Sequence, residues 1–109
     1  MDLEAPEPVA AYLAAEIGKD ADAISGCFVE NGVVRDEGRE YRGREAIRQW
    51  KADADAKYQY VLQPLSLRAN GQTVTVRASI AGNFPGSPVE LDHRFTLSGN
   101  KIASLEIRP

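Results

Sequence analysis

The sequence predicts an α+β domain whose N-terminal helices pack on an antiparallel β-sheet. Up to about residue 57 the apolar side chains recur at helical spacing, and beyond it they recur mostly at every second position. The helices precede the strands instead of alternating with them, which is typical of α+β domains. The chain has 109 residues with no internal repeat and no linker, so we expect a single domain over 1–109.

The first half of the chain predicts three helices. The first begins near Pro6 and Pro8 and ends at Gly18, because proline is favoured at helix starts and glycine at helix ends. Four-residue steps indicate its inner side, which carries Val9, Leu13 and Ile17, with Tyr12 at the edge of that stripe.

A short second helix is expected next, capped by Asp20 or Asp22 and ended by Asn31-Gly32. Residues 33–36 then predict a short strand, and residues 38–43 a polar connection. The third helix starts at Arg44. Its inner face carries Ala46, Ile47, Trp50 and Ala54.

The second half of the chain predicts four strands in a meander. Asn70-Gly71 is a strong tight-turn signal, and two prolines place a loop in the segment FPGSP. Residues 73–81 alternate well, and in residues 89–97 Leu91, His93 and Phe95 share one face. The expected strands are 58–68, 73–81, 89–97 and 102–107.

The composition excludes several classes of function and of binding site. The net charge of −3 gives no support to nucleic acid as a partner. Cys27 and His93 are the only cysteine and histidine, so an intrachain disulfide and a cysteine- or histidine-rich metal site are excluded. No apolar run is long enough for a membrane span, and MDLEAPEP does not resemble a secretion signal. We therefore expect a cytoplasmic protein without a metal, a cofactor or a membrane partner.

Three segments resemble a known family: VVRDEGR (33–39), YRGREAIRQWK (41–51) and FTLSGNKIASLEI (95–107). Together with the order of elements, they resemble the SnoaL-like branch of the nuclear transport factor 2-like superfamily, which includes polyketide cyclases and ketosteroid isomerases. The resemblance implies a cone-shaped, cystatin-like roll. In this fold a strongly curved sheet wraps around three helices and leaves a conical, mostly apolar pocket. This fold carries enzymes and non-enzymes alike, so chemistry must be argued from the site.

Asp36 is the first candidate catalytic residue. It ends a strand after two valines, and apolar surroundings raise the pKa of a carboxyl group and make it a better proton acceptor. The resemblance places the general base of the steroid isomerases at this position. The alternative is a solvated aspartate at a loop edge, paired with Arg35 or Arg39.

Tyr12 is the second candidate. The resemblance implies an oxyanion-stabilising tyrosine 24 positions before the base, which is the separation of Tyr12 from Asp36. A phenol in a dry site can donate a hydrogen bond to a developing enolate oxygen. The alternative is a helix-edge tyrosine that buries its ring and keeps its hydroxyl group in water.

The third isomerase position is a protonated aspartate, which Asp92 matches by residue type. Alternation instead puts His93 on the face of its apolar neighbours, and two adjacent residues of a strand cannot both point inward. We therefore expect His93 in the pocket and Asp92 outside, paired with an arginine across the sheet. A neutral histidine can donate a hydrogen bond or move protons, although a core histidine bonded to a carbonyl group is the alternative.

Aromatic side chains complete the predicted pocket. Phe84 is expected to act as a flap over the opening, and every member of the set could equally be part of the core. The candidate wall residues are Trp50, Tyr58, Tyr60, Phe84 and Phe95.

Two functions are consistent with the sequence. The first is a cofactor-independent enzyme that transfers protons on an apolar carbonyl compound, as an isomerase, cyclase or dehydratase. The second is a non-catalytic domain that binds a small ligand or mediates assembly. We also expect a homodimer formed through the outer sheet face, where polar side chains alternate with the core: Thr73, Thr75, Arg77 and Ser79.

Overall fold

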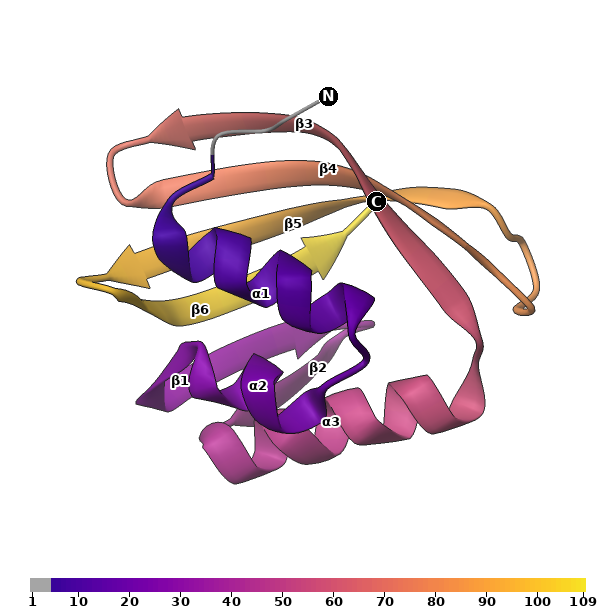
Figure 1. Ribbon diagram of the computed structural model, residues 1–109, viewed down its shortest axis with the longest axis horizontal. Coiled ribbons are helices and arrows are strands. Elements are labelled where there is room, and N and C mark those ends of the chain that lie inside the picture. Colours follow the sequence, from indigo (N-terminus) through magenta and orange to yellow (C-terminus); the bar gives the residue numbers. More distant parts are fainter. Residues whose placement is uncertain (1–4) are drawn as a thin grey trace.

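The computed structural model describes residues 5–109 and confirms the α+β class (Figure 1). Its helices are α1 (Glu7–Ile17), α2 (Ala21–Gly26) and α3 (Arg44–Lys57). Its strands are β1 (Phe28–Asp36), β2 (Arg39–Arg42), β3 (Tyr60–Asn70), β4 (Thr73–Gly82), β5 (Val89–Ser98) and β6 (Lys101–Arg108). They form one six-stranded sheet in the order β2-β1-β6-β5-β4-β3.

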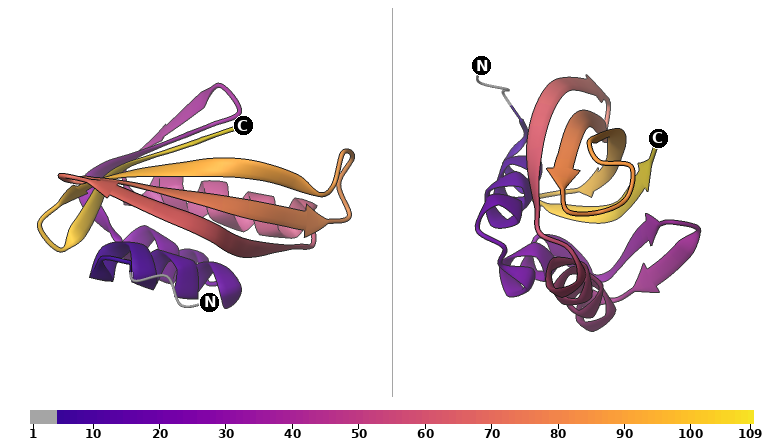
Figure 2. Two further views of the ribbon diagram at one scale, coloured as in Figure 1. Left: turned by 90° about the horizontal axis from the view of Figure 1, so that it is seen from above. Right: turned by 90° about the vertical axis from the view of Figure 1, so that its right-hand side faces the viewer.

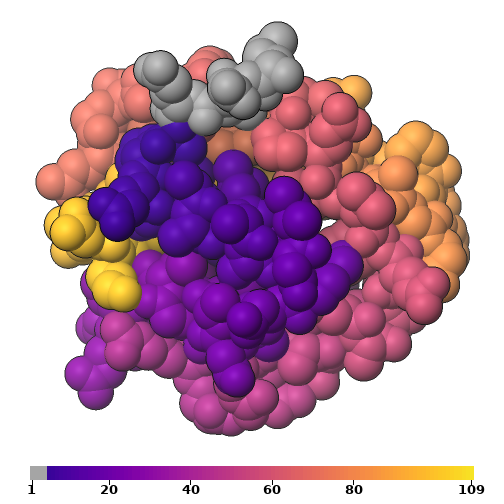
Figure 3. Space-filling view, viewed as in Figure 1, coloured from indigo at the N-terminus to yellow at the C-terminus, as the bar shows by residue number. Residues whose placement is uncertain are grey.

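The sheet is strongly curved and remains open. Figure 2 shows the strands curling around one side of the molecule while the helices lie on the other. The strand pair β1–β6 is parallel, and the other neighbouring pairs are antiparallel. Side chains of α1 and α2 cover the middle of the face in Figure 3. None of the described helices is long and apolar enough to cross a membrane.

Helices and sheet share one main core. Ile17 is 73% exposed, so the predicted stripe is wrong at its C-terminal end. The buried residues of α1 are Pro8, Val9, Tyr12, Ala15 and Glu16. The sheet contributes the inner face of the strands, as the alternation predicts. The main core cluster includes Tyr12, Phe28, Val34, Ile47, Trp50, Val74, Val76, Phe95, Ile102 and Leu105.

The predicted end of the second helix is wrong. Asn31-Gly32 lies inside β1, where the pairing with β6 is irregular between Phe28 and Val33, and α2 already ends at Gly26. A Cβ atom at Gly32 would lie 2.9 Å from the Cβ atom of Phe28. Glycine is therefore needed here for close packing within a bent strand, and not as a helix terminator.

The predicted polar connection at 38–43 is a β-hairpin. Residues 39–42 form β2 and pair with β1, with Asp36 opposite Arg39. Glu37 and Gly38 make the turn, both with positive φ angles of 53° and 75°. The strand has polar side chains on both faces, so it lacks the alternation by which strands are recognised in a sequence.

Candidate functional site

Asp36 stands at the end of β1, where its carboxylate is half-buried against α3. Its Oδ2 atom accepts a hydrogen bond from Trp50 Nε1 at 3.2 Å. Burial raises the pKa of Asp36, and the hydrogen bond from Trp50 partly offsets that rise. Arg35 pairs with Glu40 at 3.2 Å, and no ion pair joins Asp36 to Arg35 or Arg39 among the described residues. Asp36 is thus a positioned carboxylate that is more basic than an ordinary aspartate.

Asp36 also lines a surface hollow of about 390 Å³ between the β1–β2 hairpin and the end of β6. The carboxylate is therefore reachable by a small molecule from this side. The hollow is lined by Arg35, Asp36, Gly38, Arg39, Glu40, Glu106, Ile107 and Arg108.

Tyr12 lies in the centre of the core, not at the edge of a helix stripe. Its side chain is fully buried, and its ring packs edge-on against Phe95, with ring centroids 5.2 Å apart. The hydroxyl group has no hydrogen-bond partner among the described residues. Burial and, to a smaller extent, the negative charge of Glu16 raise the pKa of Tyr12 well above its ordinary value. The phenol therefore stays protonated and can donate a hydrogen bond.

His93 faces inward from β5, as the alternation predicts. It is buried, its ring stacks on Phe95 at 6.5 Å, and Nδ1 has no hydrogen-bond partner in the described part of the chain. Asp92 points outward and accepts a hydrogen bond from Arg77 at 3.2 Å, which confirms the predicted pairing across the sheet. Burial lowers the pKa of His93 to about 4, so the ring is neutral at pH 7.

This buried neutral histidine predicts a pH dependence of stability. The pKa of His93 is about 4 in the folded chain against 6.5 for a free side chain, so the unfolded chain binds the extra proton first. Its contribution, about 3 kcal/mol, is complete above pH 6.5 and is lost as the pH falls towards 4. Urea unfolding across this range should show a steeper decline for the wild type than for His93→Asn. Parallel declines would contradict the assignment.

A buried polar cluster joins α1, α3 and β3, and the sequence analysis missed most of it. The Lys51 ammonium contacts the Glu16 carboxylate and the Tyr60 hydroxyl group, and lies 3.5 Å from Asp55 Oδ1. The Tyr60 oxygen is 3.0 Å from both Glu16 Oε1 and Asp55 Oδ1. Lys51 and Glu16 are 2% and 3% exposed, so a charged pair lies in the core.

One sequence signal points to this cluster. Glu16 follows Tyr12 by four positions, and Lys51 and Asp55 follow Ile47 by four and eight. Residues four apart share a helix face, so these charges fall on the buried stripes of their helices. The matching of Glu16 with Lys51 itself depends on how α1 packs against α3, which spacing within one helix does not encode.

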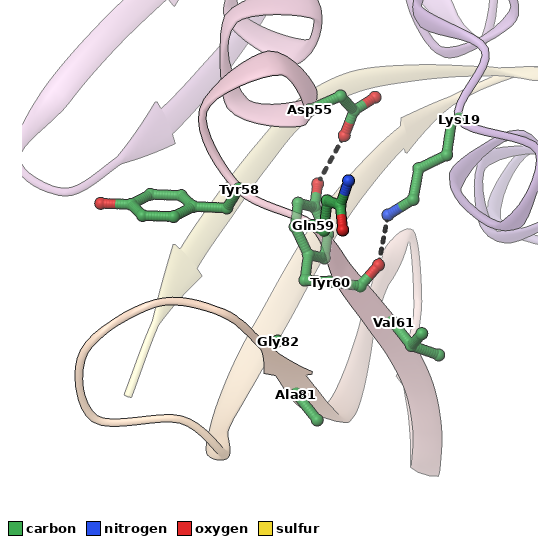
Figure 4. Close-up of a pocket in the computed structure, with 8 residues that line it drawn as sticks. All are labelled: Lys19, Asp55, Tyr58, Gln59, Tyr60, Val61, Ala81 and Gly82. Carbon is green, nitrogen blue, oxygen red and sulfur yellow. Dashed lines mark hydrogen bonds between the residues drawn. The ribbon is translucent and has the colours of Figure 1, made fainter.

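A second hollow, of about 430 Å³, opens beside this cluster between the α1–α2 turn and the start of β3. In Figure 4 Asp55 and Lys19 both reach Tyr60, whereas the ring of Tyr58 points away. The hollow is lined by Lys19, Asp55, Tyr58, Gln59, Tyr60, Val61, Ala81 and Gly82.

The predicted pocket walls occupy different environments. Trp50 holds Asp36, Phe95 lies in the core beside Tyr12, and Tyr60 joins the polar cluster. Phe84 packs on Tyr58 at 5.8 Å, at the start of the β4–β5 loop. Neither hollow is lined by Tyr12 or His93, so their convergence with Asp36 on one cavity stays a prediction.

Among residues 5–109 no group of three or more histidine, cysteine and carboxylate side chains could hold a metal ion.

Comparison with known proteins identifies the family. The order of the elements and the strongly curved, open sheet are those of a nuclear transport factor 2-like protein. Residues 9–105 match the SnoaL-like domain, and the chain belongs to this family. No protein with a curated description matches the sequence significantly.

Three solved structures are similar over nearly the whole chain. A candidate polyketide cyclase from Sinorhizobium meliloti is 40% identical, with a TM-score of 0.93 and 96% of each chain covered. A Catenulispora acidiphila protein with a ketosteroid isomerase-like fold, solved with trimethylamine, is 28% identical, with a TM-score of 0.84 over 95% of this chain and 85% of that one. SalBIII, an epoxide hydrolase/cyclase-like enzyme of pyran ring formation in salinomycin, is 25% identical, with a TM-score of 0.80 over 94% and 87%.

Proposed function

We propose that the protein is a small-molecule enzyme that transfers a proton on an apolar carbonyl compound, in a reaction of the isomerase, cyclase or dehydratase type. The observation that carries this proposal is Asp36, a half-buried carboxylate of raised pKa held by Trp50 beside an open hollow. Family membership and the similarity to a candidate polyketide cyclase support the same class of chemistry.

Each residue has a defined role in this proposal. Asp36 removes a proton from the carbon next to the carbonyl group, and the electron pair moves onto the carbonyl oxygen. Tyr12 and neutral His93 donate hydrogen bonds to that oxygen as it becomes negative. The protonated Asp36 then returns its proton to another carbon atom or to a leaving group, which restores the enzyme.

The direct test follows the exchange of α-protons for deuterium in D₂O by NMR. A panel of apolar cyclic ketones is incubated with the protein, and the loss of the proton signal is compared with that in buffer. Stereoselective exchange that saturates with ketone concentration supports the proposal. A ketone that binds without faster exchange would favour the alternative, a non-catalytic ligand-binding domain.

That alternative also rests on an observation. Tyr12 and Phe95 are fully buried and pack directly on each other, so part of the predicted cone is filled by the protein itself. A cone filled by side chains leaves less room for a substrate, which favours a domain that does not catalyse a reaction. Measured binding constants and exchange rates for the same ketones separate the two functions.

We further propose a homodimer formed through the outer sheet face. Arg77 on β4 pairs there with Glu90 and Asp92 on β5. Arg77→Glu would place three negative charges together on each protomer and weaken a two-fold contact at least tenfold. Light scattering at high micromolar concentration should give a dimer mass for the wild type and a lower mass for the variant. A monomeric wild type would overturn the proposal.

A further inference from the structure

The hollow beside the polar cluster already receives an ammonium group of the chain. The Lys19 Nζ atom lies 3.7 Å from the centroid of the Tyr60 ring and donates a hydrogen bond to the Tyr60 carbonyl oxygen. A π face and a carbonyl oxygen are both groups that attract cations. The same hollow is lined by Asp55, whose buried Oδ2 atom has no hydrogen-bond partner in the described part of the chain.

Lys19 lies in the turn between α1 and α2 with a φ angle of +53°, in the left-handed region that a side chain rarely adopts. Lys19 nevertheless remains exposed, and its contacts in the hollow are with Tyr60. Such a side chain can leave the hollow without disturbing the core.

Charge decides which class of ligand the hollow suits. Lys19 and Asp55 are its only ionisable lining residues apart from two tyrosines. When Lys19 swings out, an acceptor oxygen, an aromatic face and a carboxylate remain. The volume of about 430 Å³ lies within the roughly 300–1,000 Å³ that is usual for ligand sites.

We propose that this hollow binds a small primary organic ammonium ion, and that Lys19 is its built-in competitor. The incoming ammonium takes the place of the Lys19 Nζ atom on the Tyr60 ring and carbonyl group, in a hollow that the Asp55 carboxylate also lines. Asp55 Oδ1 already lies 3.5 Å from Lys51, so Asp55 attracts the incoming cation through the charge around the hollow and not through a direct pair. No proton transfer at Asp36 is involved, so this site is independent of the proposed enzymatic function.

The test uses NMR titration of the full chain with propylammonium, following the amide signals of Tyr60, Val61 and Gly82. Lys19→Ala should bind propylammonium about tenfold more tightly than the wild type, because a tethered competitor acts at high effective concentration. Lys101→Ala is the matched control, since Lys101 donates a hydrogen bond to the Gly26 carbonyl oxygen and does not line the hollow, and it should leave the affinity unchanged. Asp55→Asn should weaken binding severalfold.

Two further probes decide the outcome. Propan-1-ol and propionate have a similar size but carry no charge or a negative charge, and both should bind the Lys19→Ala variant much more weakly than propylammonium. If propan-1-ol bound as tightly as propylammonium, the hollow would be shown to select for apolar contact and not for charge, and the proposal would be overturned. If propionate bound the wild type more tightly than propylammonium did, Lys19 would be shown to bind anions, and this result would also overturn the proposal. Should Asp55→Asn not fold, the comparison of wild type with Lys19→Ala decides alone.

Discussion

Replacing Asp36 with asparagine is expected to slow α-proton exchange in a bound apolar ketone by about 10²–10⁴-fold. The amide cannot accept the proton, yet its oxygen can still accept the hydrogen bond from Trp50. The folded structure should therefore survive, and ketone affinity should change little. Exchange rates and ketone affinity are measured on the same samples by NMR.

Asp92→Asn is the matched control for this prediction. It makes the same chemical change on the outer sheet face, where Asp92 pairs with Arg77. Exchange should continue at the wild-type rate in this variant. Equal rates for Asp36→Asn and the wild type would remove Asp36 from the mechanism, and equal losses in both variants would point to a general effect on the fold.

Replacing Lys51 with methionine is expected to cost about 3–5 kcal/mol of unfolding free energy. The substitution leaves the Glu16 carboxylate in the core without its cationic partner, next to Asp55 and the Tyr60 hydroxyl group. Methionine fills a similar volume to lysine. The loss of unfolding free energy therefore comes mainly from the unpaired charge and not from a cavity. Urea unfolding at pH 7 measures it.

A double variant separates charge from packing. Adding Glu16→Gln to Lys51→Met removes the unpaired carboxylate and should recover about 1–3 kcal/mol. Lys57→Met, an exposed position at the end of the same helix, should stay within about 0.5 kcal/mol of the wild type. A double variant no more stable than Lys51→Met would mean that the pair does not stabilise the fold through its charges.

The sequence predicts best where one strand face is strongly apolar. On β5 the apolar neighbours of His93 outweigh the residue-type match of Asp92, and the structure confirms that His93 is buried and Asp92 lies outside. Family resemblance identified the fold over nearly the whole chain, including the curved sheet. The α3 start at Arg44 and the strand limits of β4 and β5 were likewise predictable to within a residue or two.

Prediction failed where structure depends on contacts between distant segments. Strand β2 is short and mostly polar, so its pairing with β1, and not its sequence pattern, defines it. In the sequence, Asn31-Gly32 resembles the end of a helix. In the structure, Gly32 is a strand residue that packs closely against Phe28. The Trp50–Asp36 hydrogen bond and the Glu16–Lys51 pair join separate elements, and periodicity within one element contains no information about such pairs.

The central claim is that Asp36, Tyr12 and His93 act on one carbonyl compound. A crystal structure of the protein with a bound apolar phenol, which mimics an enolate, tests it most directly. We predict the phenol oxygen within about 2.6–3.2 Å of the Tyr12 hydroxyl group or His93 Nδ1, with a ring carbon facing the Asp36 carboxylate. A phenol bound elsewhere, with Tyr12 and His93 still enclosed by the core and Asp36 facing only water, would contradict the claim.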